Sequence, residues 1–167
     1  MGRILWGCSM PPSSEVPCAG VHVFGRPDWT RPSRPEGRCL TLVSRSRTAG
    51  LVAKALARLS DPGSPAGPLA AGKALITGTI AVGGAGYKVA RITGGAADLW
   101  IFPRSGTSRW DTCAGEAMLQ ALGGLLRDKA GRPICYDPDG SFENLEGIIA
   151  GADPELVDCA VRACAKL

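Results

Sequence analysis

The residues best placed to do chemistry form one short stretch, Trp110-Asp-Thr-Cys-Ala-Gly-Glu-Ala117. Small and apolar residues at helical spacing follow it, so the pattern predicts a helix that begins near Asp111 or Thr112 and stops at Gly123-Gly124. A carboxylate at such a helix start can cap the helix. It can also hold a divalent cation such as Mg²⁺, which favours one or two carboxylates plus phosphate oxygens of a substrate. The residue types alone leave both interpretations of Asp111 open.

Two other stretches imitate ligand-binding loops but lack residues that such loops need. Gly67 to Ala74 resembles a P-loop, yet Ala74 has no hydroxyl for a metal ion and Pro68 removes one of the backbone amides that would cradle phosphate. Asp137-Pro-Asp-Gly140 resembles a calcium loop, but its glycine comes at the fourth position and such loops need it at the sixth. We expect a plain loop and a plain turn.

The elements that must position these residues alternate between strands and helices. Compact apolar or alternating runs predict strands, and apolar residues recurring every three or four positions predict helices. The predicted strands span residues 3–10, 20–24, 39–43, 74–82, 97–102, 133–136 and 147–150. The predicted helices span residues 51–59, 87–92, about 111–122 with an apolar stripe that reaches Leu125, and 154–164. This order indicates a layered α/β architecture.

The length of 167 residues suits one globular domain with loose segments. Residues 25–38 contain three Pro, two Gly and four Arg without periodicity, which is typical of a loop. We therefore divide the chain into residues 1–38, with N-terminal strands and a Pro/Gly/Arg-rich loop, and residues 39–167, an α/β domain that carries the candidate site.

The net charge of +4 comes from 19 basic and 15 acidic residues and is concentrated near the N-terminus. Seven arginines and three acidic residues lie within the first 50 positions. Single arginines spread among Pro and Gly are typical of a solvated loop, because a nucleic-acid-binding arm has a tighter cluster with interleaved aromatics. We expect no nucleic acid polymer as a partner, whereas an anionic small molecule would fit.

Seven cysteines, no Cys-x-x-Cys pair and a single histidine argue against a disulfide framework and against a zinc site. No apolar run approaches the roughly 18 residues that span a bilayer, and no signal-peptide pattern opens the chain. The sequence therefore predicts no membrane span and a cytoplasmic location.

The stretch Trp110–Ala117 resembles the Trp-Asp-x-x-Ala-Gly signature of the inositol monophosphatase superfamily of metal-dependent phosphatases. Three further segments resemble that superfamily in the same order: Val43-Ser-Arg-Ser46, Gly83-Gly-Ala-Gly-Tyr-Lys88 and Ala97-Asp-Leu-Trp-Ile101. Within the superfamily the chain is most similar to the 3′(2′),5′-bisphosphate nucleotidases. The resemblance covers the C-terminal half of the family pattern and implies the corresponding half of its layered α-β-α sandwich, with residues 1–38 a remnant of the upstream domain.

The resemblance also implies roles for particular residues. Asp111 would be a ligand of Mg²⁺. The implied substrate-binding residues are Ser44, Ser46 and Arg47 beside the nucleotide, Gly84, Ala85 and Lys88 at the nucleotide and its remaining phosphate, and Arg104 as a looser candidate for the same pocket. From the residues alone, Lys88 could instead be an exposed helical lysine, and Gly83–Gly86 could be only a tight turn.

The chain departs from the family pattern in two respects. Arg47 stands where the pattern has His after Ser-Arg-Ser, which keeps a positive charge but loses a flat imidazole. The earlier metal motifs, a paired-acid loop and Asp-Pro-x-Asp-Gly-Thr, are absent, and Asp137-Pro-Asp-Gly140 cannot replace them because it is one residue too short and follows the Trp-Asp motif. No catalytic residue is assigned for this reason.

The implied activity is magnesium-dependent removal of the 3′-phosphate of adenosine 3′,5′-bisphosphate, which gives AMP and phosphate. One alternative is a non-catalytic module that binds a nucleotide or a partner protein. A second alternative is an inositol phosphate phosphatase. The sequence leaves the oligomeric state open.

Overall fold

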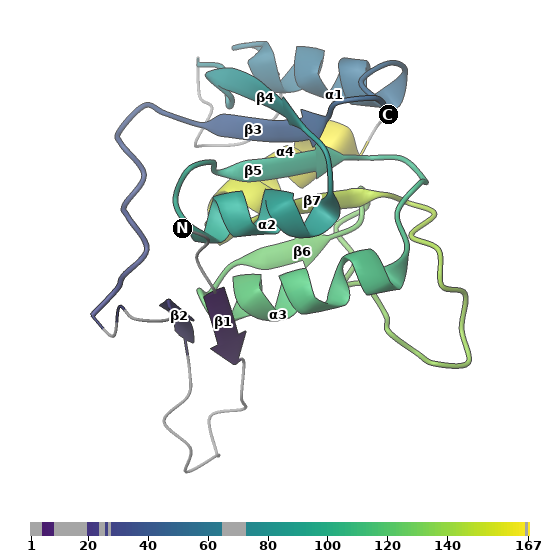
Figure 1. Cartoon of the computed structure of the whole chain (residues 1–167). Helices are drawn as coiled ribbons and strands as arrows, with labels where there is room; N and C mark the ends of the chain where they lie inside the picture. The colour runs from purple at the N-terminus through teal and green to yellow at the C-terminus, as the bar shows by residue number, and fades with distance from the viewer. Residues whose placement is uncertain (1–4, 9–19, 24–25, 27, 65–72, 166) are drawn as a thin grey trace.

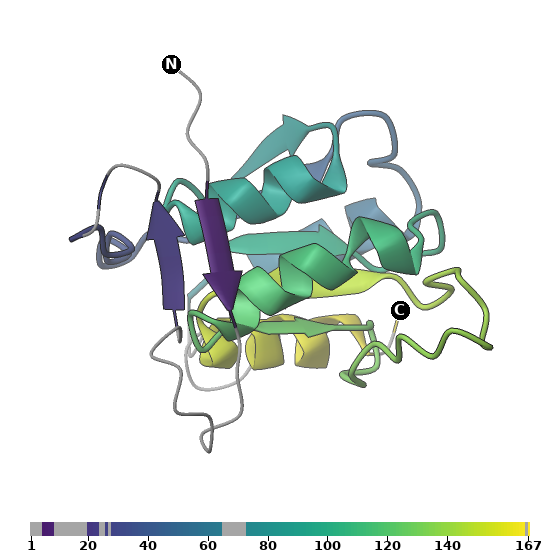
Figure 2. The same ribbon diagram turned by 60° about the horizontal axis from the view of Figure 1, so that its bottom comes forward.

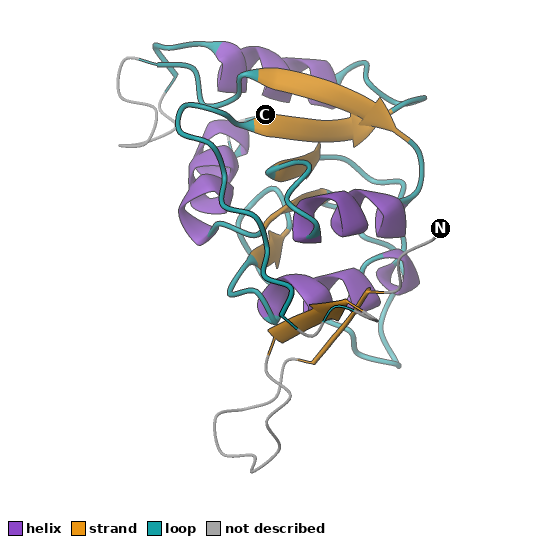
Figure 3. Cartoon of the chain, turned by 60° about the vertical axis from the view of Figure 1, so that its left-hand side comes forward, coloured by secondary structure: helices purple, strands orange, loops and turns teal. Residues whose placement is uncertain are grey.

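The structure is a computed structural model that describes residues 5–8, 20–23, 26, 28–64, 73–165 and 167. Its centre is a five-stranded sheet with helices on both faces, as Figures 1 and 3 show. The expected layered α-β-α sandwich is therefore confirmed.

The central sheet is mixed, with the strand order β4-β3-β5-β7-β6. Its strands are β3 (Leu40–Ser44), β4 (Gly78–Val82), β5 (Leu99–Phe102), β6 (Leu125–Arg127) and β7 (Ile148–Gly151). Strand β3 pairs in parallel with β4 and β5, whereas β7 pairs antiparallel with β5 and β6. The helices are α1 (Leu51–Ser60), α2 (Ala85–Thr93), α3 (Cys113–Gln120) and α4 (Pro154–Cys164).

Strand β5 shows how the sequence builds a core on both faces of the sheet, because all four of its residues are buried. Leu99 and Ile101 belong to the core cluster that includes residues of α1 and α4. Trp100 and Phe102 point to the opposite cluster, which includes residues of α2 and α3. Successive side chains of a strand alternate between faces, so one apolar run serves both helix layers.

Strands β3, β4 and β5 run in the same direction, so their carboxyl ends meet at one edge of the sheet. The chain passes from β3 through α1 to β4 on one side, and then through α2 to β5 on the other side of β3. Ligands of open α/β sheets bind at such reversals of strand order, outside the carboxyl ends of the strands.

A separate two-stranded antiparallel sheet consists of β1 (Leu5–Cys8) and β2 (Gly20–Val23). Strand β1 contacts α3, and Figure 2 shows the pair beside α2 and α3, on the side away from the central sheet. The two sheets lie on either side of residue 38 in the chain, but the division into residues 1–38 and 39–167 stays a prediction. The outer parts of the expected strands 3–10 and 20–24, and most of the P-loop-like stretch, fall outside the described residues.

Two sequence-based predictions are wrong after α3. The helical stripe was expected to reach Leu125, but α3 ends at Gln120 and Leu125 begins β6. Gly123 turns the chain with a φ of 76°. A side chain on Gly124 would overlap the backbone of Gly151, so the two glycines let the chain pass close against β7. The expected strand 133–136 is absent, apart from an isolated bridge at its first residue.

Two element starts also differ from expectation. The strand expected from residue 74 begins at Gly78, because the N–H groups of Leu75 and Ile76 both donate to the carbonyl oxygen of Leu59, at the end of α1. Helix α2 begins at Ala85, inside the glycine-rich turn, and not at Tyr87. Gly84 is the N-cap residue, so the glycines of this turn lead straight into a helix N-terminus.

Two glycines with the same backbone conformation give a stability test of the loop before β7. Gly147 and Gly123 have φ angles of 75° and 76°, but a Cβ on Gly147 would overlap the backbone of Phe102 and Arg104, whereas one on Gly123 would meet nothing. Gly123→Ala should lower the free energy of unfolding by about 1–2 kcal/mol, the cost of a left-handed alanine. Gly147→Ala should cost about 1–3 kcal/mol more, because of the overlap. Urea unfolding measures both, and equal losses would contradict the close approach at Gly147.

Candidate active site

A cavity of about 220 Å³ lies at the carboxyl ends of β3, β4 and β5. It gathers seven of the eight site residues expected from the sequence: Ser44, Ser46, Arg47, Gly84, Ala85, Lys88 and Asp111. Arg104 does not line the cavity; its side chain is exposed and donates to the carbonyl oxygen of Ser105. The roles of all eight residues stay predictions, but seven of them share one place.

The N-terminus of α2 opens onto this cavity. Gly84, with a φ of 72°, ends the turn after β4, and Ala85 is the first residue of the helix; both line the cavity. No side chain caps this helix end. The amides of the first helical turn have no partner within the helix, and their partial positive charge favours an anion.

Lys88 is buried one turn into α2, with 5% of its surface exposed. Its ammonium donates to the carbonyl oxygen of Gly84 at 3.3 Å and lies 5.4 Å from the ring centroid of Trp100. Burial lowers the pKa of Lys88 below its ordinary value. The interpretation of Lys88 as an exposed helical lysine is therefore wrong.

No carboxylate in the described part of the chain forms an ion pair with Lys88. A buried charge is costly unless it is paired. The cation-π contact with Trp100 and a single carbonyl offset part of that cost. An anion in the cavity would supply the missing partner.

Trp100 is a cavity residue that the sequence analysis missed. It lies in the expected strand motif Ala97–Ile101, but an apolar strand pattern does not indicate which of its side chains lines a cavity. The side chain is 1% exposed and lines the cavity, and its buried Nε1–H has no hydrogen-bond partner among the residues that the structure describes. Buried donors without partners are rare, so this one also fits a site that accepts a ligand.

Arg47 closes one side of the cavity. Its guanidinium donates to the carbonyl oxygen of Gly106 at 2.9 Å and so links the loop after β3 to the loop after β5. Gly106, with a φ of 127°, leaves no room for a side chain beneath this guanidinium. Gly106 and Thr107 also line the cavity and were not expected from the sequence.

Asp111 ends a short 3-10 turn, η2 (Arg109–Asp111), that precedes α3. One carboxylate oxygen, Oδ2, accepts from the backbone N–H of Ser108 at 2.9 Å. The other oxygen, Oδ1, has no hydrogen-bond partner among the described residues. Thr112 occupies the N-cap position of α3, so Asp111 is not the cap residue of that helix. Its side chain instead takes part in a capping box at the start of η2, in which Ser108 is the N-cap residue, so the capping interpretation holds for this turn. The carboxylate of Asp111 orders the preceding turn and keeps one oxygen available.

The donor set around Asp111 fits one ligand position of Mg²⁺. Such ions use one or two carboxylates and fill their other positions with water and phosphate oxygens. Asp111 is the one carboxylate that lines the cavity in the described part of the chain. No group of three or more His, Cys, Asp or Glu residues within this part could hold a metal ion. The cavity therefore offers a single protein ligand and not a complete cluster.

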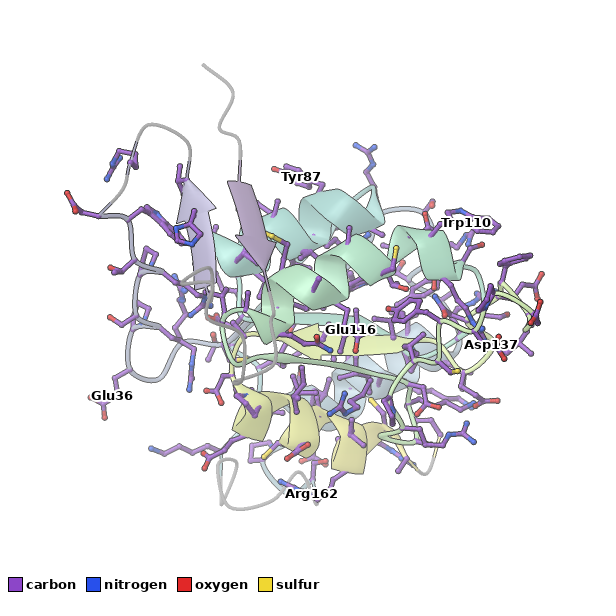
Figure 4. All side chains as sticks on the ribbon, turned by 90° about the horizontal axis from the view of Figure 1, so that it is seen from below. Glu36, Tyr87, Trp110, Glu116, Asp137 and Arg162 are labelled. Carbon is purple, nitrogen blue, oxygen red and sulfur yellow. The ribbon has the colours of Figure 1, made fainter. Side chains whose placement is uncertain are left out.

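Two exposed rings, those of Trp110, which precedes Asp111 in the chain, and of Phe142, lie with their centroids 5.7 Å apart. Figure 4 shows Trp110 and Asp137 at one edge of the molecule.

Asp137–Gly140 forms a turn in which the Gly140 N–H donates to the carbonyl oxygen of Asp137. The prediction of a plain turn at this place is confirmed.

Within the described residues, no helix is both long enough and apolar enough to cross a bilayer.

Comparison with known proteins places these features in context. A profile of the inositol monophosphatase family matches residues 13–165. The chain is 29% identical over 150 residues to 3′(2′),5′-bisphosphate nucleotidase 1 of Rattus norvegicus, a match that covers 90% of this chain and 40% of the rat protein. The chain thus spans less than half the length of that relative.

Solved structures show the same fold. SaIMPase-II bound to 2′AMP superposes with a TM-score of 0.61 at 13% identity, covering 88% of this chain and 49% of the other. The inositol monophosphate complex of SaIMPase-II gives a TM-score of 0.61 at 14% identity, with 88% and 50% covered. The profile match extends over most of the sequence and the fold agrees with it, so this chain belongs to the inositol monophosphatase family.

Proposed function

We propose that this chain carries the nucleotide-binding part, and one metal ligand, of a magnesium-dependent phosphatase that removes the 3′-phosphate of adenosine 3′,5′-bisphosphate. The observation that carries the proposal is the cavity lined by the buried Lys88, which has no ion pair among the described residues, by the N-terminus of α2 and by the carboxylate of Asp111. A family relative is named a bisphosphate nucleotidase, and members of the family are generally metal-dependent.

Two groups of residues that line the cavity suit the two phosphates of such a substrate. The ammonium of Lys88 and the first amides of α2 would hold the phosphate that stays on the product. Asp111 would hold Mg²⁺ at the phosphate that leaves. Bound Mg²⁺ polarises a phosphoryl group and lowers the pKa of a water molecule that attacks it. Ser44, Ser46 and Arg47, which line the same cavity, would bind the nucleotide.

Two alternatives keep specific support. The single carboxylate of the cavity favours a non-catalytic module that binds a nucleotide or a partner protein. The inositol monophosphate complex of SaIMPase-II favours an inositol phosphate phosphatase. The second cationic position at Lys88 distinguishes our proposal from the latter, because an inositol monophosphate has no second phosphate to place there.

We also propose a reducing compartment such as the cytoplasm. The five cysteines whose side chains are described are all free thiols, namely Cys39, Cys113, Cys135, Cys159 and Cys164. Free thiols without disulfides are usual in reducing compartments.

The chain of 167 residues by itself should show no phosphatase activity, because Asp111 without partner carboxylates cannot assemble the metal cluster that activates water. The assay is phosphate release from adenosine 3′,5′-bisphosphate with millimolar Mg²⁺. Turnover of about 1 per second or more, an ordinary enzyme rate, would show that the chain holds a complete metal site.

Binding should nevertheless depend on Lys88. Lys88→Met keeps a long side chain but removes the charge, and hydrogen bonds to charged groups contribute about 1.5–3 kcal/mol. The dissociation constant for adenosine 3′,5′-bisphosphate, measured by calorimetry, should therefore rise about 10- to 150-fold. Lys54→Met is the matched control, because Lys54 is exposed on α1, away from the cavity, and should bind as the parent chain does. Equal affinity of both variants would remove Lys88 from the site.

The same binding should weaken at alkaline pH. Burial lowers the pKa of Lys88, so its ammonium loses its proton at a lower pH than an exposed lysine does. Affinity for adenosine 3′,5′-bisphosphate should be full below that pKa and fall as the pH rises through it, whereas the residual binding of Lys88→Met should lack this fall. Identical pH profiles for the two chains would contradict an interaction between the ammonium and the ligand.

A further inference from the structure

The arginine-rich loop before β3 plays no part in the proposed function. Its described part, residues 28–38, is fastened where β3 and β5 begin. Arg31 donates through Nε to the carbonyl oxygen of Ile92, near the end of α2, at 3.0 Å. Arg38 donates to the carbonyl oxygen of Gly95, in the turn before β5, at 3.1 Å. The loop therefore lies at the end of the central sheet opposite the candidate active site.

A cavity of about 210 Å³ lies beside this loop. Five residues line it: Arg31, Arg34, Asp98, Asp153 and Leu156. Asp98 comes directly before β5, and Asp153 is the N-cap residue of α4. Three separate segments of the chain therefore bring charged side chains to one place.

Three guanidinium groups meet two carboxylates here, so one positive charge is in excess. Arg34 pairs with Asp153 at 3.3 Å. Arg38, which adjoins the cavity, pairs with Asp98 at 3.4 Å. The second oxygen of each carboxylate accepts from backbone N–H groups, so both carboxylates are fully engaged. The third guanidinium, that of Arg31, is left without a carboxylate.

Arg31 forms no ion pair within the described part of the chain, and its Nη2 has no hydrogen-bond partner there. Asp28 and Glu36, the acidic residues of the same loop, are exposed, and Figure 4 shows Glu36 pointing away from the body of the molecule. Burial, the largest effect, lowers the pKa of Arg31, and two neighbouring guanidinium groups lower it too, against the two carboxylates, which raise it. A guanidinium keeps its proton at neutral pH, so an anion in the cavity would relieve the cost of this charge.

We propose that this cavity is a second anion site, which binds a carboxylate on a short apolar chain. One excess charge suits a monoanion and not a phosphate dianion, and the planar fork of a guanidinium matches the two oxygens of a carboxylate. Leu156 supplies an apolar wall for the chain of the ligand. Such a group belongs either to a small free acid or to a glutamate side chain of another protein. The inference does not depend on the proposed function, because it uses other residues at the other end of the sheet.

The test is titration of the full chain with butyrate at neutral pH, followed through the NMR signals of the Arg31 Nε–H and of the backbone amides of residues 31–34 and 98. These signals should shift and saturate. Butyramide, which has nearly the same shape without the charge, should leave them unchanged, and inorganic phosphate should bind more weakly than butyrate. Acetyl-glutamate methylamide carries its carboxylate as a protein side chain does. Binding as tight as that of butyrate assigns the site to a partner protein, and weaker binding assigns it to a free acid.

Substitutions identify the group that binds the probe. Arg31→Gln removes the excess charge and should weaken butyrate binding about 10-fold or more, since hydrogen bonds to charged groups are stronger than neutral ones. Arg31→Lys keeps the charge but not the fork and should lose less affinity. Arg162→Gln is the matched control, because Arg162 is exposed on a later turn of α4 (Figure 4), and it should bind butyrate as the parent chain does. Butyrate should also raise the melting temperature of the parent chain but not that of Arg31→Gln, because a ligand stabilises the folded state that binds it.

Several results would overturn the inference. Saturable shifts with butyramide would show that apolar contact alone holds the probe, and unchanged affinity in Arg31→Gln would remove the guanidinium from the site. Phosphate binding that is tighter than butyrate binding at these residues would contradict a monoanion. If Arg31→Gln does not fold, the Arg31 Nε–H signal of the parent chain decides, and its failure to shift with butyrate overturns the inference.

Discussion

The candidate site depends on a positive charge that the fold buries and that forms no ion pair with a carboxylate among the described residues. Lys88 lies within α2, over the ring of Trp100, with one carbonyl as its hydrogen-bond partner. Paired parallel strands bring the first turn of α2 to the same edge as the loops after β3 and β5. The carbonyl of Gly84 and the ring of Trp100, which contact this charge, belong to residues that line the cavity. An arrangement that would be costly in a closed core becomes useful where an anion can enter.

Much of this fold could be predicted from the sequence, because its signals are local. The apolar run of β5 and the Asp153-Pro154 start of α4 have direct physical causes, and both elements occur where expected. The failures arise where tertiary contacts override the local pattern. Helix α3 ends before its apolar stripe reaches Leu125, because Gly124 packs closely against the backbone of β7. Residues 133–136 have the sequence pattern of a strand, but there the Tyr136 hydroxyl donates a hydrogen bond to Glu116.

Some residues of the site belong to sequence motifs, whereas others are recognised only from how the folded chain packs. Seven expected residues meet in one cavity because the motifs follow the ends of neighbouring strands. Trp100 could not be found in this way, since its significance lies in a buried indole N–H that has no hydrogen-bond partner among the described residues. Such a feature leaves no pattern along the chain. The chain belongs to the inositol monophosphatase family and spans 40% of the length of the rat relative. Among the described residues, its cavity contains one carboxylate, that of Asp111.

The central claim is that one cavity, at the carboxyl ends of β3, β4 and β5, receives a bisphosphate nucleotide. The most direct measurement is a backbone amide chemical-shift map of the chain titrated with adenosine 3′,5′-bisphosphate. Our account predicts the largest shifts at residues 44–47, 83–88 and 106–111. A map centred on the arginine-lined cavity around Arg31 and Arg34, at the opposite end of the sheet, would contradict it.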